Sequence, residues 1–312
     1  RACGEGVDGE PNSIEAAKWF RKASEAGHGV AQWELARQLQ VVPGPVYVVE
    51  AYQWTLKAAE QGIAEAQTNL GFCYAEGRGV EADETQAVEW FAKAAEQGEP
   101  QAQCRLAERL RDGRGAEVDQ EAARKLFGQA AVQGVVFAQF ALAEMCAQGE
   151  GGEIDEDAAT QWFRKAAEQG HAGAQNNLAE RLVETNSAEA MEWYEKAAEQ
   201  NCVPAQYNLG RRLFEGDGQA AVHWLKLAAA ADHTEAQFLL GRACGEGVDG
   251  EPNSIEAAKW FRKASEAGHG EAQWELTRQL QAVPGPVYVV EAYRWTLKAA
   301  EQGIAEAQTN IG

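Results

Sequence analysis

A few groups of residues in this chain have types and spacings that could do chemistry. Gly4, Gly6 and Gly9 match the G-x-G-x-x-G pattern of glycine-rich turns that hold a dinucleotide, and residues 245–250 repeat it. That pattern binds phosphate when it joins a strand to the start of a helix, and no strand pattern precedes it here. The motif therefore predicts a turn between helices rather than a nucleotide site.

Four histidines and one acidic run could in principle hold a metal ion. His28, His171, His233 and His269 share one position, just past the end of a predicted helix, where an imidazole can interact with the helix C-terminus. A metal site would need further ligands close by, and none is apparent. The acidic residues 153–157 lack the ligand order of an EF-hand and favour a solvated helix N-terminus. We predict no metal and no cofactor.

The six cysteines and the remaining motif searches give no catalytic site. No two cysteines form C-x-x-C, and Cys3, Cys146 and Cys244 occupy one equivalent helix position, which predicts small buried filler. The sequence contains no G-x-S-x-G or H-E-x-x-H motif and no credible Ser/His/Asp grouping. We therefore predict that the protein is not an enzyme.

The charge of the chain limits its partners. Lys and Arg total 28 and Asp and Glu total 48, which gives a net charge of −20. So acidic a chain repels phosphate backbones, which argues against nucleic acid and anionic membranes as partners. No apolar run approaches the roughly 18 residues of a membrane span. We therefore expect the partner to be a protein.

Two sequence markers recur in fixed phase along the chain. The steps between successive Ala-Gln dipeptides are 31, 35 or 36 residues. These dipeptides begin at 31, 66, 102, 138, 174, 205, 236, 272 and 307. A tryptophan recurs with the same steps, and Leu126 takes its place once. These tryptophans are Trp19, Trp54, Trp90, Trp162, Trp193, Trp224, Trp260 and Trp295. Two markers per period indicate two elements per repeat.

Both elements of the repeat are predicted to be helices. Seven positions before the tryptophan site stand residues that cap helix N-termini: Asn12, Asp83, Asp119, Asp155, Asn186, Asp217 and Asn253. Eight positions after it stand residues that tolerate the left-handed conformation ending a helix: Gly27, Gly62, Gly98, Gly134, Gly170, Asn201, Asp232, Gly268 and Gly303. The chain is therefore predicted to be all-α, built from helical hairpins.

The combined pattern resembles the Sel1-like repeat, a relative of the tetratricopeptide repeat. It reads A-x-A-Q-x-x-L-G-x-x-Y-x-x-G-x-G-V, then D and A-x-x-W-F-x-x-A-A-x-x-G, and residues 64–98 match it almost letter for letter. The resemblance implies an α-solenoid of antiparallel helix pairs in a right-handed superhelix. It covers residues 1–312, as one solenoid of about eight full units with partial units at both ends. Members mostly act as adaptors or scaffolds, many in bacteria, so a bacterial protein is expected. Its compartment stays open, with export or the cell surface favoured over the cytoplasm.

In the related tetratricopeptide repeats the first helix lines the concave face, and this analogy selects two residues per repeat. They are the residue after Ala-Gln and the one four positions further on. The candidate partner-binding residues are Trp33, Arg37, Phe72, Glu108, Phe140, Glu144, Glu180, Tyr207, Arg211, Phe238, Arg242, Trp274 and Arg278. Two interpretations stay open: the aromatic rings pack between neighbouring repeats, or they anchor an extended peptide in a groove.

A long internal recurrence raises an alternative function. Residues 1–71 return as residues 242–312 with five differences: Val30/Glu271, Ala36/Thr277, Val41/Ala282, Gln53/Arg294 and Leu70/Ile311. Such identity exceeds what helix packing requires. The primary prediction is a scaffold that binds proteins or extended peptides through its concave face. The alternative is a structural protein, a segment of a longer solenoid or a protomer that associates with itself head to tail in a filament.

Overall fold

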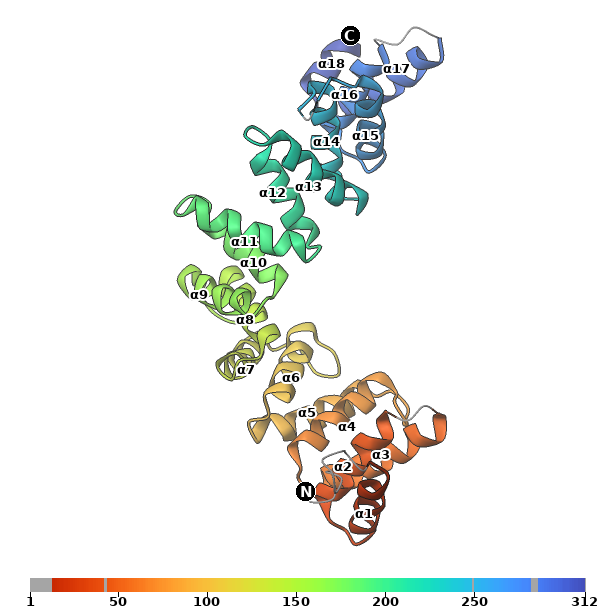
Figure 1. The fold of residues 1–312 in the computed structure, drawn as a ribbon, viewed down its shortest axis with the longest axis vertical. Coiled ribbons are helices and arrows are strands. Elements are labelled where there is room, and N and C mark those ends of the chain that lie inside the picture. The colour runs from red at the N-terminus through yellow and green to blue at the C-terminus, as the bar shows by residue number, and fades with distance from the viewer. Residues whose placement is uncertain (1–12, 42–43, 249, 282–285, 312) are drawn as a thin grey trace. The chain divides into compact units, whose positions relative to one another are not determined.

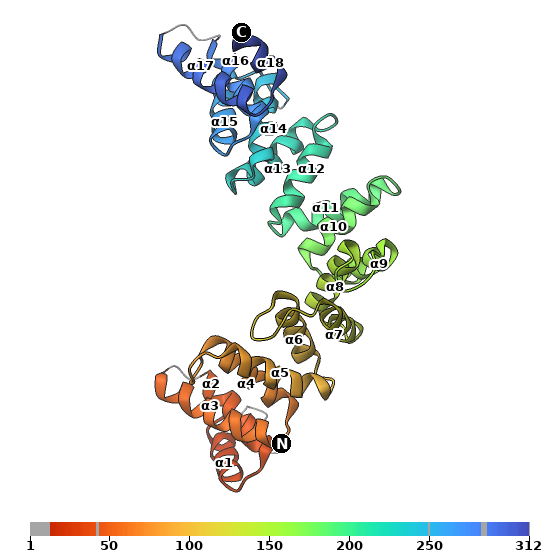
Figure 2. The same cartoon turned by 180° about the vertical axis from the view of Figure 1, so that it is seen from behind.

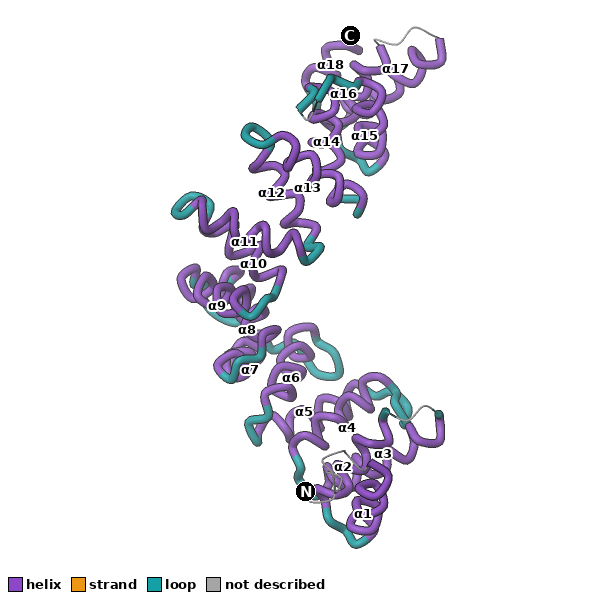
Figure 3. Tube along the Cα trace, viewed as in Figure 1, coloured by secondary structure: helices purple, strands orange, loops and turns teal. Residues whose placement is uncertain are grey.

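The computed structural model describes residues 13–41, 44–248, 250–281 and 286–311. Throughout these residues the regular elements are α-helices joined by short turns, and no strand occurs among them (Figure 3). The prediction of an all-α chain is therefore confirmed.

The chain divides into two compact units, Arg1–Gln169 and Gly170–Gly312. The first contains α1 (Ser13–Glu25), α2 (Gly29–Gln40), α3 (Pro45–Glu60), α4 (Ala64–Glu76), α5 (Glu84–Glu96), α6 (Pro100–Asp112), α7 (Gln120–Val132), α8 (Val136–Gln148) and α9 (Glu156–Glu168) (Figure 1). The second contains α10 (Ala172–Leu182), α11 (Ser187–Glu199), α12 (Val203–Leu213), α13 (Gly218–Ala230), α14 (Thr234–Glu246), α15 (Ser254–Glu266), α16 (Gly270–Gln281), α17 (Pro286–Glu301) and α18 (Ala305–Ile311).

Within each unit the helices alternate between two roles. We call the even-numbered helices, which carry the Ala-Gln marker, A helices, and the odd-numbered helices B helices. Each A helix packs most extensively against the B helix that follows it, as α4 does against α5 and α14 against α15. The same alternation can be followed from behind in Figure 2. The repeat is thus an antiparallel A–B hairpin.

The predicted helix ends are confirmed. Asp83, Asp119, Asp155, Asn186, Asp217 and Asn253 each accept a hydrogen bond from a backbone N–H in the first turn of a B helix. These bonds satisfy donors that have no partner inside the helix. At the other end Asn201 and Asp232 have φ values of 61° and 60°, and glycine holds positive φ at the matching sites. The predicted cap Asn12 lies outside the described residues.

The core is built from alanine, leucine and large aromatic side chains. Phe91, Phe127, Phe163 and Tyr194, one on each of four B helices, are at most 2% exposed. Gly71 of α4 allows one of these rings to approach closely, because a Cβ there would lie 2.7 Å from Cε1 of Phe91. Glycine and alanine at such contacts bring helix backbones together without leaving a void.

The glutamine of each Ala-Gln marker joins successive repeats. In α4, Gln67 donates from Nε2 to the carbonyl of Ala59, near the end of the preceding B helix, at 3.1 Å. Gln97, at the end of α5, donates in turn to Oε1 of Gln67 at 2.6 Å. The first bond recurs from Gln32, Gln103, Gln139, Gln206, Gln237, Gln273 and Gln308, each reaching back eight residues. The marker therefore reflects a buried polar bridge between repeats.

Candidate functional site

The candidate site is the A face of the second unit. We define the A face as the side of the A helices that carries the residue after Ala-Gln and the residue four positions later. In the second unit this face bears Glu180 on α10, Tyr207 and Arg211 on α12, Phe238 and Arg242 on α14, and Trp274 and Arg278 on α16. Two clefts open along it, and five of these seven residues line one cleft or the other.

The first cleft lies between α12 and α14 and has a volume of about 790 Å³. We call it the basic cleft; it is lined by Arg211, Arg212, Phe214, Glu215, Leu239, Arg242, Glu246 and Val248. The Arg242 guanidinium is held from two sides, 2.9 Å from Oε1 of Glu246 and 5.6 Å from the ring centre of Phe214. The Arg211 guanidinium lies 5.7 Å from the ring centre of Tyr207.

The basic cleft therefore holds uncompensated positive charge. Among the residues that the structure describes, neither Arg211 nor Arg212 forms an ion pair, and both are exposed. Phe214, Leu239 and Val248 provide an apolar lining beside them. Planar guanidinium groups bind carboxylates through two parallel hydrogen bonds, so this lining suits a carboxylate next to an apolar group.

The second cleft lies along α14, α16 and the start of α18, with a volume of about 590 Å³. We call it the acidic cleft; it is lined by Phe238, Glu271, Trp274, Glu275, Arg278, Gly303, Ile304, Ala305 and Glu306. Glu275 pairs with Arg278 at 2.9 Å. Glu271 and Glu306 are exposed and make no ion pair in the described part of the chain. A half-buried tryptophan beside carboxylates is a favourable setting for a cationic group.

The aromatic residues of this face differ in accessibility. Phe238 is 8% exposed, and its ring lies 5.9 Å from that of Phe261 and stacks at 4.4 Å on the imidazole of His269. Tyr207 is half-buried and stacks at 4.6 Å on His233 of the next repeat. For Phe238 the contact with Phe261 lies within the α14–α15 hairpin, and the contact with His269 is with the next repeat. Trp274 is half-buried and opens into the acidic cleft.

Three of the histidines between B and A helices cap the helix that follows them. Nδ1 of His171, His233 and His269 accepts the backbone N–H of the third residue of α10, α14 and α16, at 3.1 to 3.2 Å. We expected these side chains to interact with the C-terminus of the preceding helix, and they instead cap the N-terminus of the next one. The turn between a B helix and the following A helix is so short that the same residue lies close to both helix ends. Burial lowers the pKa of His171 and of His233.

Glu180 lies in a small polar network on the same unit. Its Oε1 accepts Nδ2 of Asn208 at 2.9 Å and Nδ2 of Asn176 at 3.2 Å, which joins α10 to α12. Tyr194 packs nearby, and burial, with a smaller effect of Glu180, raises the pKa of Tyr194 to about 12. The hydrogen bonds hold the Glu180 carboxylate in place between the two helices.

In the first unit the predicted residues on α2 and α4 are largely occupied by internal contacts. Trp33 is half-buried and packs against the cluster of Ala66, Leu70 and Cys73 on α4. Arg37 is exposed but pairs with Glu34 on its own helix at 3.2 Å. Phe72 makes an edge-to-face contact with Phe91 at 5.3 Å.

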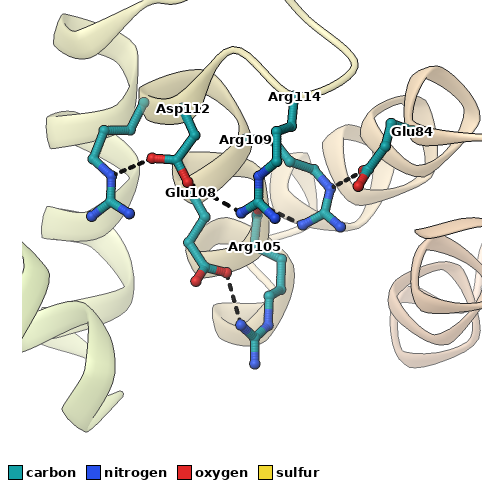
Figure 4. Close-up of polar contacts among 7 residues, drawn as sticks. Glu84, Arg105, Glu108, Arg109, Asp112 and Arg114 are labelled. Atoms are coloured by element: carbon teal, nitrogen blue, oxygen red, sulfur yellow. Dashed lines mark hydrogen bonds and ion pairs between the residues drawn. The ribbon is translucent and has the colours of Figure 1, made fainter. Parts of the chain in front are cut away.

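The predicted residues on α6 and α8 lie beside a network of arginines and carboxylates. Glu108 pairs with Arg105 at 2.8 Å, and Arg109 reaches Glu84 of α5 at 3.0 Å (Figure 4). On α8 burial raises the pKa of Glu144, and Phe140 lies 5.9 Å from Phe163. In this part of the chain the arginines bind acidic residues of the protein itself.

Sequence reasoning did not select several residues that line the clefts. Arg212 and Glu275 each lie one position after a selected residue, and Glu271 lies three positions before one. A face of a helix spans positions i, i+3, i+4 and i+7, so two positions per repeat undercount it. The substitution of Val30 by Glu271 between the two near-identical segments was a signal that could have pointed to the acidic cleft.

Reactive or metal-binding groups are not part of this site. Among the described residues no group of three or more His, Cys, Asp or Glu side chains could hold a metal ion. Burial raises the pKa of the Cys73 thiol to about 11 and that of Cys104 to about 12, which disfavours the reactive thiolate. Within the same residues no helix is both long and apolar enough to cross a membrane.

Comparison with known proteins identifies the family. The Sel1 repeat model matches residues 1–28, 48–63, 64–99, 100–135, 136–171, 172–202, 203–233, 234–269 and 289–304. The matches cover most of the chain, and the chain therefore belongs to the Sel1 repeat family. Its fold is an α-solenoid of antiparallel helix pairs, and proteins with Sel1 repeats are generally non-catalytic scaffolds that bind other proteins.

Two solved structures are particularly similar. One is a protective antigen present in uropathogenic Escherichia coli strains, which displays an SLR fold, with 31% identity and a TM-score of 0.86. The match covers 94% of this chain and 66% of that protein, slightly less than two thirds of it. The other is a Sel1 repeat protein from Oxalobacter formigenes, with 29% identity and a TM-score of 0.69, covering 94% of this chain and 88% of that one. No curated protein sequence matches.

Proposed function

We propose that the protein is a non-enzymatic scaffold that binds an extended segment of a partner protein on the A face of its second unit. One observation carries the proposal: the tryptophan and arginines of this face border two adjoining clefts instead of being fully used in packing. Half-buried tryptophan and unpaired arginine are typical anchors of protein interfaces. The rigid helices that carry them limit the entropy lost on binding.

Peptide display offers a direct test. A random library of extended peptides is selected on the whole chain, and the enriched peptides are measured against the chain carrying Arg211→Glu and Trp274→Ala. We expect the double substitution to weaken binding at least tenfold, because it reverses one anchor and removes another. A chain carrying Lys125→Glu on α7 serves as the control for an added negative charge. Selected peptides that bind the double variant as tightly as the original chain would refute the proposal.

A different observation favours the alternative, head-to-tail association. A cleft of about 1000 Å³ lies along α17, lined by Val290, Glu291, Arg294, Trp295, Leu297, Lys298 and Glu301. The matching face of α3 in the near-identical first segment is covered by the next repeat, where Leu56 packs in the same cluster as Trp90 of α5. Leu297, its counterpart, is 42% exposed. A further Sel1 repeat, of the same chain or of a second copy, would cover this face similarly.

The alternative is tested by the state of association in solution. Sedimentation velocity over a wide concentration range should reveal growing oligomers, and Leu297→Glu should abolish them because it places a charge in the apolar contact. The control Leu227→Glu changes an exposed leucine on α13. A single monomeric species at high concentration would exclude the filament.

A further inference from the structure

The two clefts of the second unit carry opposite charge and adjoin across one helix. Arg242 and Leu239 of α14 line the basic cleft, while Phe238 of the same helix lines the acidic cleft. An α-helix with its side chains is about 10 Å across. An extended peptide advances about 3.3 Å per residue, so about three residues would carry it from one cleft to the other.

The unpaired arginine in the basic cleft has a specific structural origin. Arg212 of α12 occupies the same repeat position as Arg109 of α6, six residues after the marker glutamine. Arg109 binds Glu84, the first residue of the preceding B helix, at 3.0 Å. At that position the B helix before α12 has Ser187, which offers no carboxylate. The internal partner is missing, and the guanidinium is left for an external one.

We propose that the basic cleft holds an acidic residue of a partner peptide next to an apolar one, and that the acidic cleft holds a basic residue of the same peptide. This assignment of partner chemistry rests on the proposed function. Arg211 and Arg212 bind the carboxylate, and the apolar neighbour packs on Phe214, Leu239 and Val248. The ammonium or guanidinium group lies near Trp274 with Glu271 and Glu306, where cation–π and ionic attraction add.

The net charge of −20 gives this arrangement a second consequence. An acidic peptide is repelled at long range by the chain as a whole, and it is attracted only within a few ångström of the arginines. A peptide that also carries a basic end is attracted by the rest of the surface. A segment with both charges therefore suits this face better than a purely acidic one.

Fluorescence anisotropy with labelled peptides tests the assignment on the whole chain. The probe contains Glu-Glu-Leu, a three-residue Gly-Ser spacer and Lys-Lys. We expect replacement of its Glu by Gln, or of its Lys by Gln, to weaken binding about tenfold each, the effect of about 1.4 kcal/mol. Arg211→Ala with Arg212→Ala should weaken binding of the original probe about tenfold and leave the Gln-for-Glu probe unchanged. Glu271→Gln with Glu306→Gln should likewise weaken binding of the original probe about tenfold and leave binding of the Gln-for-Lys probe unchanged.

Two further variants sharpen the result. Ser187→Glu restores the internal partner of Arg212 and should weaken the probe several-fold without removing any cleft residue. Arg78→Ala with Arg114→Ala removes two exposed arginines from turns of the first unit and should leave binding unchanged. Circular dichroism confirms that each variant is folded.

The failure of this inference is separable from the failure of the proposed function. If display-selected peptides depend on Arg211 and Trp274 but show no preference for either charge, the scaffold proposal stands and the assignment of charges is refuted. If inorganic phosphate competes for the arginines more strongly than acetate at equal concentration, the basic cleft is a phosphate site and the assignment is also refuted. If no peptide depends on the A face, both are wrong.

Discussion

Arg109 of the first unit and Arg212 of the second hold one repeat position and meet different surroundings. Arg109 is 6% exposed, pairs with Glu84 at 3.0 Å and lies 4.7 Å from the ring centre of Phe91 (Figure 4). Arg212 is exposed and makes no ion pair among the described residues. The difference follows from the first residue of the neighbouring B helix, glutamate in one case and serine in the other. One substitution in a neighbouring helix decides whether an arginine joins repeats or faces a partner.

The largest effect on stability is expected from Arg109→Ala. It removes a buried guanidinium that joins α6 to α5, with its contact on Phe91, and should reduce the free energy of unfolding by about 3 kcal/mol. Urea unfolding followed by circular dichroism measures the change. The matched change at the equivalent position, Arg212→Ala, is its control. A loss below about 1 kcal/mol for Arg109→Ala would show that the ion pair is not structurally important.

Acid should destabilise the second unit more than the first. Burial lowers the pKa of His171 and His233 in the folded chain, so below about pH 6.5 the unfolded chain binds protons more readily and stability falls as the pH drops. Protonation also removes the Nδ1 acceptor, and the loss of an N-cap costs about 1 kcal/mol each. Hydrogen exchange at pH 7.5 and pH 5 locates the effect.

The matched control replaces both histidines by asparagine, which caps without titrating. His171→Asn with His233→Asn should reduce the acid sensitivity of α10 and α14. In the first unit His28 makes no side-chain cap, so its helices should respond less. Equal acid sensitivity in both units would contradict the assignment of this role to the capping histidines.

A smaller effect on the free energy of unfolding is expected at Gln237, which in the described part of the chain lacks the second hydrogen bond of the glutamine bridge. Among the residues that the structure describes, the buried Oε1 of Gln237 has no hydrogen-bond partner, and Ala267 stands where Gln97 stands in the first unit. Ala267→Gln should raise the free energy of unfolding by about 1 kcal/mol, and Gln97→Ala should lower it by a similar amount. Thermal and urea unfolding measure both. If Ala267→Gln does not raise the free energy of unfolding, the new side chain does not reach Gln237.

The smallest effects on stability are expected at the basic cleft itself. Arg211→Ala and Arg212→Ala should each change the free energy of unfolding by less than about 0.5 kcal/mol, because neither side chain is buried or forms an ion pair with a described residue. Ser187→Glu should raise it by a few tenths of a kcal/mol through a partly exposed ion pair. A loss above about 1 kcal/mol in either arginine variant would place that arginine among the structural contacts and weaken the comparison with Arg109.

Much of the fold was predictable because its signals are local. Asp83, Asn186 and the glycines with positive φ act within one turn of chain, so their spacing alone defined the helix ends. The role of His233 was not predictable in the same way. It lies three residues after the end of α13 and directly before the start of α14, and only the direction of its imidazole separates an N-cap from a C-terminal contact.

The candidate site was predicted in part. The choice of two positions per repeat selected Arg211, Arg242, Trp274 and Arg278, which line clefts and are not buried, but also Phe238, which lines the acidic cleft although its side chain is buried. The ring of Phe238 is covered by Phe261 and His269, which lie 23 and 31 positions further along the chain. Spacing within one helix contains no information on that contact.

The sequence by itself determined the helical hairpin, the repeat, the caps and the family, because these arise from residues that interact within a turn or recur at a fixed period. The tertiary structure decided which polar groups remain available. Arg109 and Arg212 hold the same repeat position, yet among the described residues only Arg109 forms an ion pair. Gln67 and Gln237 are both marker glutamines, yet among those residues only the Oε1 of Gln67 accepts a hydrogen bond. A polar side chain remains available to a partner protein when the neighbouring helix places no acceptor or donor within about 3 Å of it. That distance is set by how the helices pack and not by the order of residues in the sequence.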